Sequence, residues 1–445
     1  MNPKIFKAYD IRGIYPEEID EEAAYKIGAA FAVFIKKASS KENPQIVVGR
    51  DNRKSSDSLF NALSRGLIEQ GVNVVDIGLS ATPTLYFSVA NYNYDGGINI
   101  TSSHNPKQYN GFKLVREKAI PLSGDSGIEE IKELAMSNDF SKVEKLGEII
   151  KKDTSNDYIA INKIKDSFDI RMIVDTANSV SGILVPKMLD QINLVHIFSE
   201  LDGDFPNHEP DPLKKENIEK LQKKVVEDGA DLGVAFDGDG DRVFFINELG
   251  ETISSDKILA LVSSIVLKEN SNNKIIYDVR CSNIVKETIK DLKGEAIISK
   301  VGHSFIKSLM NEKDIIFGAE YSGHYYLKQG DSYYESPYFV VFKIIEEMKK
   351  TGKKLSQLIN PFKKYYHSGE INFKADNKEK IIEKVKERYI NGQLLIIDGL
   401  RIDFDDWWLS IRASNTEPIL RLIVEAKTRE LMEEKLKEIE TIIQV

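Results

Sequence analysis

The sequence has almost no cysteine and no long apolar run, and both absences narrow the class of protein. Its one cysteine, Cys281, excludes an internal disulfide and is typical of proteins in a reducing cytosol. Residues 1–9 lack the apolar core of a signal peptide, and the longest apolar run, around 258–267, is too short to cross a bilayer. We therefore expect a soluble, cytoplasmic protein with no membrane partner.

An excess of basic residues is also absent. The chain has 61 Lys and Arg against 70 Asp and Glu, a formal net charge of -9, so its composition does not suggest a surface for nucleic acid. A site for an anionic substrate would have to be a local cluster of arginine and lysine. Three sequence motifs that mark catalytic or nucleotide-binding loops in other enzyme classes are also absent: Gly-x-Ser-x-Gly, the Walker loop and Gly-x-Gly-x-x-Gly.

The order of predicted helices and strands indicates several domains in the 445 residues. Three α/β patterns follow one another, and a smaller α+β pattern completes the chain. We predict domains at 1–150, 151–252, 253–362 and 363–445. Helices are predicted at 22–38, 55–70, 182–189, 216–228, 256–268, 282–292 and 428–443. Strands are predicted at 46–50, 72–78, 97–101, 171–174, 194–198, 274–279, 296–300, 315–320 and 420–425.

Residues 237–242, Asp-Gly-Asp-Gly-Asp-Arg, place three carboxylates at alternate positions. Hard divalent cations prefer oxygen ligands, and the glycines let a short loop fold so that the aspartates converge. The flanking residues 231–236 and 243–246 are typical of buried strands, which would hold the loop rigidly. The pattern therefore indicates a metal site, with an exposed acidic turn as the alternative.

An EF-hand is the nearest rival for this loop, because Asp237, Asp239, Asp241 and Glu248 occupy four of its ligand positions. The position that needs glycine for the sharp turn holds Arg242, however, and the flanks are strands where an EF-hand has helices. Three carboxylates leave a Mg²⁺ shell incomplete, and such ions are usually shared with water and phosphate oxygens. The aspartates therefore predict a phosphate partner.

Residues 101–106, Thr-Ser-Ser-His-Asn-Pro, follow a predicted strand, and the proline ends its regular structure. A serine on a rigid loop can act as a covalent nucleophile, and a neighbouring histidine, asparagine or backbone amide can stabilise a phosphoryl group. A turn that caps a helix explains the same residues without catalysis. By itself, this loop leaves both interpretations open.

Two more polar loops follow predicted strands. Residues 318–324 offer a carboxylate, a hydroxyl and an imidazole, a set suited to hydrogen bonding with sugar hydroxyls. Residues 412–418, with Arg421, bring two guanidiniums and three short donors together, the usual chemistry of a phosphate clamp. Ordinary polar turns are the alternative for both. Because each loop comes from a different predicted domain, we expect the loops to meet in a cleft between domains.

With these four loops, the chain resembles the α-D-phosphohexomutase family along nearly its whole length. The family's signatures occur in order as the phosphoserine loop 101–106, the metal loop 237–242, the sugar loop 320–324 (Glu-Tyr-Ser-Gly-His) and the phosphate loop 412–418 (Arg-Ala-Ser-Asn-Thr-Glu-Pro). Shorter matches are 9–13 (Tyr-Asp-Ile-Arg-Gly), 110–113 (Asn-Gly-Phe-Lys) and 300–304 (Lys-Val-Gly-His-Ser).

The resemblance implies a heart-shaped enzyme with four domains around a central cleft. Three related α/β domains with mixed sheets would precede a C-terminal α+β domain similar to TATA-binding-protein-like folds. The implied activity is that of an isomerase, which moves a phosphoryl group between O1 and O6 of a hexose with Mg²⁺, a phosphoserine and a hexose 1,6-bisphosphate that is both intermediate and activator. Phosphoryl transfer depends chiefly on positioning and charge neutralisation, which such loops can supply.

The resemblance also assigns site residues in three groups. Those matched to catalysis are Ser103, Arg12, Lys113 and His303, with Ser103 as the phosphoserine. Those matched to the metal are Ser103, Asp237, Asp239 and Asp241. Those matched to substrate binding are Tyr9, His104, Arg242, Arg280, Glu320, Ser322, His324, Arg412, Ser414, Asn415, Thr416 and Arg421.

Proton transfer is assigned to two residues within these groups, Lys113 and His303. For Lys113 a cationic surface position is the alternative, and for His303 it is a histidine that caps the following helix. Arg280 stands where several relatives carry lysine. Since arginine keeps the charge but loses lysine's proton chemistry, we assign Arg280 to binding alone.

The sugar and phosphate loops resemble the phosphomannomutase/phosphoglucomutase branch. Phosphoglucosamine mutases share Glu-x-Ser-Gly-His but more often show Ser-Gly-Thr where this chain has Ser-Asn-Thr. We therefore expect mannose and glucose phosphates as preferred substrates, with phosphoglucosamine mutase as the alternative. A Mg²⁺-dependent phosphomonoesterase and a calcium-binding module are the interpretations from other classes. We expect no nucleic-acid partner and a monomer or homodimer.

Overall fold

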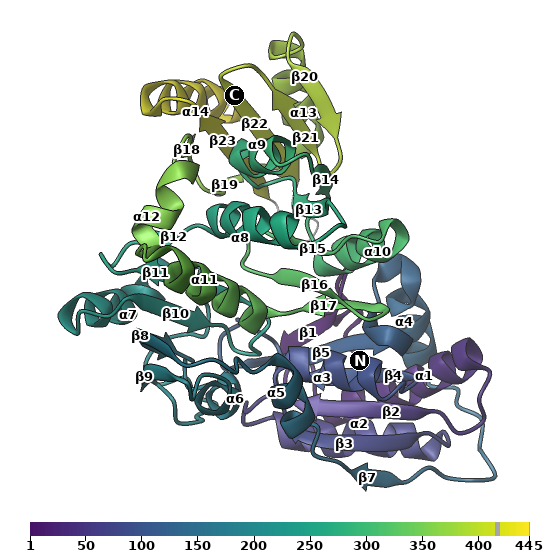
Figure 1. Ribbon diagram of the computed structural model, residues 1–445. Coiled ribbons are helices and arrows are strands. Elements are labelled where there is room, and N and C mark those ends of the chain that lie inside the picture. The colour runs from purple at the N-terminus through teal and green to yellow at the C-terminus, as the bar shows by residue number, and fades with distance from the viewer. Residues whose placement is uncertain (414–418, 445) are drawn as a thin grey trace. The chain divides into compact units, whose positions relative to one another are not determined.

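The computed structural model describes residues 1–413 and 419–444. The chain forms two compact units (Figure 1). The first unit comprises Met1–Ile253, Met310–Lys313 and Ser322–Ser356, and the second comprises Ser254–Leu309, Asp314–Tyr321 and the chain from Gln357 onward.

The first unit begins with a mixed sheet in the order β1-β5-β4-β2-β3-β7, with β6 paired to β5. Strand β2 is parallel to β3 and β4, whereas β5 is antiparallel to β1 and β4. The strands are β1 (Ile11–Ile14), β2 (Gln45–Arg50), β3 (Asn73–Leu79), β4 (Gly96–Ile100), β5 (Tyr109–Arg116), β6 (Ile120–Pro121) and β7 (Ile149–Lys151).

Helices cover both faces of this sheet: α1 (Glu21–Ser39), α2 (Ser56–Glu69), α3 (Thr82–Asn91) and α4 (Ile128–Ser137). Helix α1 begins where Asp20 accepts a hydrogen bond from the Ala23 N–H at 2.8 Å. The apolar faces of α1, α2 and α4 share one core with Ile46 and Val48 of β2. Because strand side chains alternate, Val47 points to the opposite face, and α3 contacts β2 and β4 outside that core.

A second mixed sheet in the first unit has the order β12-β11-β10-β8-β9. Its strands are β8 (Phe168–Asp175), β9 (Ile192–Ile197), β10 (Leu232–Phe236), β11 (Val243–Asn247) and β12 (Thr252–Ile253), accompanied by helices α5 (Ser155–Asn162), α6 (Ser181–Met188) and α7 (Lys215–Glu227). Helix α7 buries Leu221 and Val225 in a core with Ile173 and Ile246. The antiparallel pair β10 and β11 flanks the predicted metal loop, as the sequence predicts.

The first unit also contains the antiparallel strands β16 (Tyr325–Gln329) and β17 (Ser332–Glu335), followed by helix α11 (Pro337–Thr351). In the second unit, β13 (Lys274–Asp278) pairs in parallel with β14 (Glu295–Ser299) and β15 (Phe317–Ala319). Helices α8 (Ser255–Glu269) and α9 (Asn283–Asp291) lie wholly in this unit, and so do the larger parts of α10 (His303–Lys313) and α12 (Leu355–Ile359).

The end of the chain forms an antiparallel sheet in the order β18-β23-β22-β21-β20, with β19 paired to β23. The strands are β18 (Tyr366–His367), β19 (Ile371–Lys374), β20 (Gln393–Ile396), β21 (Leu400–Asp403), β22 (Trp407–Ala413) and β23 (Ile419–Ala426). Helices α13 (Lys378–Arg388) and α14 (Arg429–Gln444) pack on one face, where Val385 and Ile439 share a core with Leu409 and Leu422. The opposite face carries polar residues, including Arg412 and Arg421.

The predicted fold class, three α/β domains with mixed sheets and a C-terminal α+β domain, is confirmed. The element limits are also close, since the helix predicted at 22–38 spans Glu21–Ser39 and the one predicted at 428–443 spans Arg429–Gln444. None of the helices in the described part of the chain combines the length and apolar character that a membrane span requires.

Candidate active site

Ser103 follows β4 in a loop with an unusual backbone. Its φ is 49°, in the left-handed region that residues other than glycine seldom occupy, and such residues cluster at functional sites. Thr101 Oγ1 accepts a hydrogen bond from the Ser103 N–H at 2.9 Å, and the Ser103 hydroxyl donates to Asp237 Oδ2 at 2.8 Å. The loop therefore presents the serine oxygen to the metal loop.

A buried arginine that the sequence analysis did not single out holds the serine loop. Arg53, which follows β2, donates at 2.7–3.1 Å to backbone carbonyls of Ser103, Asn105, Pro106 and Tyr109. Burial lowers the pKa of Arg53, whereas Asp51, 3.0 Å from its Nε, opposes that shift. The signal in the sequence was an aspartate and an arginine directly after a buried strand.

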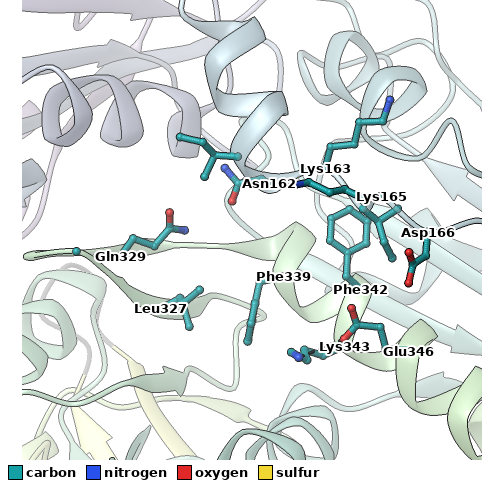
Figure 2. A pocket seen from close by; sticks show the side chains of 13 residues that line it. Asn162, Lys163, Lys165, Asp166, Leu327, Gln329, Phe339, Phe342, Lys343 and Glu346 are labelled. Atoms are coloured by element: carbon teal, nitrogen blue, oxygen red, sulfur yellow. Dashed lines mark ion pairs between the residues drawn. The ribbon is translucent and has the colours of Figure 1, made fainter. Parts of the chain in front are cut away.

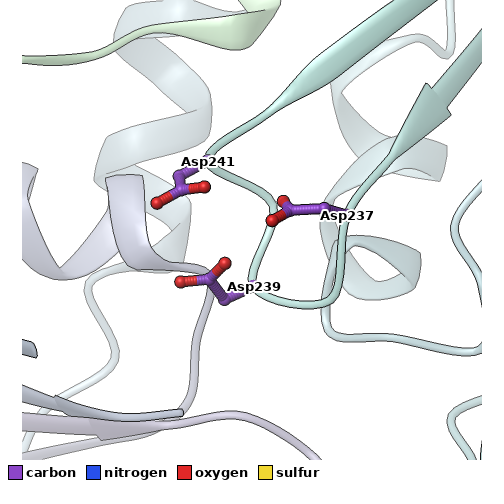
Figure 3. Close-up of side chains that lie close together, drawn as sticks. All are labelled: Asp237, Asp239 and Asp241. Carbon is purple, nitrogen blue, oxygen red and sulfur yellow. The ribbon is translucent and has the colours of Figure 1, made fainter. Parts of the chain in front are cut away.

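The loop between β10 and β11 gathers the three aspartates (Figure 3). Carboxylate oxygens of Asp237, Asp239 and Asp241 lie within 4.8 Å of one another, and all three residues are buried. Gly238 is required here, because a Cβ at that position would lie 2.3 Å from the Ser103 carbonyl oxygen. The glycine therefore lets the metal loop and the serine loop approach each other closely.

The donor set fits a divalent cation such as Mg²⁺. Carboxylate oxygens are the ligands that such ions prefer, and the Ser103 hydroxyl adds another oxygen next to Asp237. Asp239 Oδ1 is buried and has no hydrogen-bond partner in the described part of the chain. A buried acceptor without a partner is costly, and a bound cation would satisfy it.

Lys113, from β5, supplies positive charge to the aspartates. Its Nζ lies 2.6 Å from Asp239 Oδ2 and also pairs with Asp241. Burial lowers the pKa of the ammonium, but the two carboxylates outweigh burial and raise it above its ordinary value. Burial and the other aspartates raise the pKa of Asp237 to about 8. Burial acts in the same direction on Asp241, but Lys113 and His324 outweigh it and hold that pKa well below its ordinary value.

Arg242, at the end of the metal loop, connects it to the sugar loop. Its backbone N–H donates to Asp237 Oδ1 at 3.1 Å, and its Nε lies 3.2 Å from His324 Nε2. The same His324 nitrogen lies 3.2 Å from Asp241 Oδ1, and Ser322 Oγ lies 3.1 Å from His324 Nδ1. Ser322 and His324 therefore lie against the metal loop within the first unit.

Arg12 contacts the serine loop, and His104 belongs to it. Arg12 Nη2 lies 2.6 Å from Asp10 Oδ2, and its Nη1 donates to Asn105 Oδ1 at 2.7 Å. His104 Nδ1 lies 3.3 Å from Ser103 Oγ. Burial and the nearby guanidiniums hold the pKa of His104 well below its ordinary value. The imidazole is therefore neutral at physiological pH and available for hydrogen bonding.

The second unit gathers another group at the carboxyl ends of its parallel strands. Glu320, directly after β15, accepts a hydrogen bond from the Gly302 N–H at 2.7 Å, and His303 begins α10 beside that glycine. Arg280 Nη2 lies 2.7 Å from Asp278 Oδ2 and 3.7 Å from Glu320 Oε1. Ligands commonly bind at this edge of parallel sheets.

The C-terminal sheet of the second unit contains two paired arginines. Arg412 of β22 lies directly opposite Arg421 of β23 in the strand register. Glu370 contacts both, with Oε2 at 2.6 Å from Arg412 Nη2 and Oε1 at 3.6 Å from Arg421 Nη1. Asp398 lies 3.3 Å from Arg412 Nη1. We refer to Arg412 and Arg421 as the arginine clamp.

The structure thus connects many of the predicted site residues by direct contacts. In the first unit these are Arg12, Ser103, His104, Lys113, Asp237, Asp239, Asp241, Arg242, Ser322 and His324. Tyr9 is half-buried just before β1. The second unit holds Arg280, His303 and Glu320 at one sheet edge, and Arg412 and Arg421 in the clamp. Ser414, Asn415 and Thr416 lie outside the described residues.

A cavity of about 680 Å³ elsewhere in the first unit involves none of these residues (Figure 2). Charged residues at its wall pair with neighbours, Lys343 with Glu346 at 3.2 Å and Lys163 with Asp190. The labelled lining residues are Asn162, Lys163, Lys165, Asp166, Leu327, Gln329, Phe339, Phe342, Lys343 and Glu346.

Family models for phosphoglucomutase/phosphomannomutase match the chain in succession. The α/β/α domain I model matches residues 3–142, the domain II model 150–250 and the domain III model 254–365. The model of the C-terminal domain matches residues 370–442.

Full-length relatives agree with these matches. The chain is 41% identical to a phosphomannomutase of Methanocaldococcus jannaschii, over 99% of this chain and 97% of that protein. It is 37% identical to a phosphomannomutase of Vibrio cholerae, over 98% of each. A crystal structure of a phosphoglucomutase/phosphomannomutase family protein from Burkholderia thailandensis matches with a TM-score of 0.91 at 30% identity, over 100% of this chain and 98% of that one. The chain belongs to the phosphoglucomutase/phosphomannomutase family.

Proposed function

We propose that the protein is a phosphomannomutase/phosphoglucomutase, an isomerase that interconverts hexose 1-phosphate and hexose 6-phosphate. The observation that carries this proposal is the contact between the Ser103 hydroxyl and Asp237 at 2.8 Å, within a loop of three buried aspartates. A serine nucleophile, clustered carboxylates and buried cations are the parts that phosphoryl transfer requires.

The reaction would proceed in two transfers through Ser103. In the first, the bond between phosphorus and Ser103 Oγ breaks and a bond from phosphorus to the free sugar hydroxyl forms, and we assign the departing hydroxyl proton to His303. The resulting hexose 1,6-bisphosphate turns around. In the second transfer, the phosphoryl group at its other end returns to Ser103 Oγ, and the released sugar oxygen regains a proton.

The buried charges around Ser103 would serve this transfer. Asp237, Asp239 and Asp241 would hold Mg²⁺, which when bound neutralises charge on phosphoryl oxygens. Lys113 and Arg242 would offset the remaining negative charge. Lys113, whose ammonium lies 2.6 Å from Asp239, would also exchange a proton with the reacting sugar hydroxyl, as the resemblance implies.

The remaining predicted residues would bind the sugar phosphate. Glu320, Ser322 and His324 offer acceptors and donors for sugar hydroxyls, and the arginine clamp offers guanidiniums for the phosphate that does not react. We assign Arg280, His104 and Tyr9, with Ser414, Asn415 and Thr416, to the same task, and Arg12 to catalysis, where it would offset charge on the transferring group. The domain limits 1–150, 151–252, 253–362 and 363–445, a cytoplasmic location, a monomeric or dimeric state and a bisphosphate activator complete the proposal.

The direct test replaces Ser103 and its neighbour separately. With glucose 1-phosphate, Mg²⁺ and glucose 1,6-bisphosphate, Ser103→Ala should lower turnover at least about a thousandfold, because the nucleophile is lost. Ser102→Ala is the matched control, since the Ser102 hydroxyl is buried in the same loop without a hydrogen-bond partner in the described part of the chain. Full mutase activity in Ser103→Ala would refute the mechanism.

A second assay separates the substrate classes. Phosphates of glucose, mannose, glucosamine and N-acetylglucosamine are compared side by side, and release of inorganic phosphate is measured in the same tubes. We expect glucose and mannose phosphates to give the highest kcat/KM. A site that contacts only the O3 and O4 hydroxyls accepts glucose and mannose alike. Dominant activity with glucosamine phosphate would identify the enzyme as a phosphoglucosamine mutase. Release of inorganic phosphate without isomerisation would favour a phosphomonoesterase.

A further inference from the structure

Glu370 lies between the two arginines that the proposed function assigns to phosphate binding. Its Oε2 lies 2.6 Å from Arg412 Nη2 and its Oε1 lies 3.6 Å from Arg421 Nη1, so one carboxylate contacts both guanidiniums. The side chain of Glu370 is 21% exposed, and those of Arg412 and Arg421 are 11% and 30% exposed. The contact is therefore partly shielded from water and remains accessible to a small anion.

The strand register favours a negative group at this position. Arg412 and Arg421 are directly opposite each other on β22 and β23, and like charges in such cross-strand pairs repel. Glu370 precedes β19, which pairs with the other side of β23. Burial raises the pKa of Glu370, but Arg412 and Arg280 outweigh burial and lower it below its ordinary value. Glu370 is therefore ionised at neutral pH and compensates the clamp.

The clamp has more donors than Glu370 contacts. Each guanidinium carries five N–H donors, and Glu370 contacts one nitrogen of each, Nη2 of Arg412 and Nη1 of Arg421. The Nε atoms of both arginines are buried, so a phosphate would bind through the Nη groups, close to the carboxylate that already contacts them. Two anions would then share one pair of cations.

We propose that Glu370 competes with the phosphate of the substrate for Arg412 and Arg421, and so limits how tightly the clamp holds phosphate. The proposal rests on the proposed function, in which the clamp binds the phosphate that does not react. A mutase must let go of one end of the bisphosphate so that the other end can take its place. Binding energy that is equal for all bound states lowers KM without raising kcat, so a weaker clamp favours this exchange.

The test measures binding of inorganic phosphate to the full-length protein by calorimetry. Glu370→Gln keeps the shape of the side chain and removes its charge, and we expect phosphate to bind on the order of tenfold more tightly. Glu383→Gln removes the same charge from an exposed pair with Lys386 on α13, and we expect it to leave the affinity unchanged. Thermal melting of each variant verifies that it is folded.

A double variant tests whether the gain in phosphate affinity depends on the contact between Glu370 and the arginine clamp. In an Arg412→Gln background, Glu370→Gln should improve phosphate affinity less than about twofold, because the guanidinium that lies 2.6 Å from Glu370 is gone. Weaker or unchanged phosphate binding in Glu370→Gln would overturn the proposal, since it would make Glu370 a positioning group for the arginines or irrelevant to them. An equal gain in both backgrounds would overturn it as well.

Binding of inorganic phosphate does not depend on turnover, so this result stands apart from the proposed function. If the wild-type protein lacked mutase activity while Glu370→Gln bound phosphate more tightly, the proposed competition would be supported and the assigned mutase reaction would be refuted. With mutase activity present, Glu370→Gln should also lower the KM for glucose 1-phosphate while kcat falls or stays level. A raised KM would overturn the competition even if the mutase assignment held.

Discussion

The aspartate loop and the arginine clamp differ in how deeply their charged side chains are buried. Around the aspartates, Lys113 is 5% exposed and Asp239 is 0% exposed, and the ammonium contacts two carboxylates directly. In the clamp, Arg412 and Arg421 are 11% and 30% exposed, and Glu370, the carboxylate that contacts both, is 21% exposed. The difference indicates that the first region is preorganised for chemistry, whereas the second stays open to an incoming ligand.

The largest effect is expected from removing the ammonium group of Lys113, which pairs with two carboxylates of the aspartate loop. Lys113→Met leaves Asp239 and Asp241 buried without it, so the free energy of unfolding of the metal-free protein should fall by about 3–5 kcal/mol. Mg²⁺ should restore part of this loss, because a cation bound only to the folded state stabilises it. Urea unfolding with and without Mg²⁺ at constant ionic strength measures both changes.

The control for this variant is Lys107→Met, which removes an exposed lysine 3.5 Å from Asp204. Surface ion pairs contribute little, so a change below about 0.5 kcal/mol is expected. If Lys113→Met without Mg²⁺ were as stable as Lys107→Met, the aspartate loop would not be the charge-compensated site described above.

Arg53 tests whether the serine loop is held by the same buried network. Arg53→Met removes the donors to backbone carbonyls of the loop and leaves Asp51 without its partner. We expect a loss of about 3 kcal/mol in the free energy of unfolding. Mutase turnover should fall too, because Ser103 loses its support. Lys54→Met, an exposed neighbour, is the matched control, and equal stability of the two variants would contradict this role of Arg53.

The clamp should respond differently, with a change in binding and little change in stability. Arg421→Gln removes one partly exposed guanidinium, and we expect the KM for glucose 1-phosphate to rise about tenfold, as for the loss of a charged hydrogen bond. The melting temperature should change by less than about 2 °C. A large loss of stability with an unchanged KM would reverse the contrast between the two regions.

A smaller effect is expected from His208, which pairs with buried Asp175 at the end of β8. Its Nε2 lies 3.0 Å from Asp175 Oδ2. Burial lowers the pKa of His208, but Asp175 outweighs burial and raises it. A raised folded-state pKa stabilises the protein fully below the unfolded-state value of about 6.5, and this contribution is lost as pH rises through the folded-state value.

His208→Gln should therefore reduce the decline of stability with rising pH above about 6.5. Urea unfolding at a series of pH values measures the slope. A slope identical to that of wild type would show that the pair with Asp175 does not titrate as described.

Local patterns in the sequence predicted the framework of the metal loop well. The strands on either side of it were recognisable because they are short apolar runs, one ending before Asp237 and the other beginning after Arg242, and they correspond to β10 and β11. Helix α3 was not predicted. It is buried from Thr82 to Val89, so its sequence lacks the polar face from which helical periodicity is recognised.

Local sequence patterns did not predict the residues that support the site. Arg53 contacts a loop about fifty residues further along the chain, and Glu370 meets Arg412 only because β19, β22 and β23 share a sheet. Such pairings depend on strand order, which a single sequence does not reveal. The roles of the site residues and the exact domain limits stay predictions.

In the proposed mechanism, Ser103 carries the transferred phosphoryl group. The most direct measurement incubates the protein with glucose 1,6-bisphosphate labelled with ³²P, locates the label by peptide mass spectrometry, and then adds unlabelled glucose 6-phosphate. One labelled residue is expected, Ser103, with no label in Ser103→Ala and loss of the label to the sugar during the chase. Label on another residue, or turnover without any labelled protein, would contradict this mechanism.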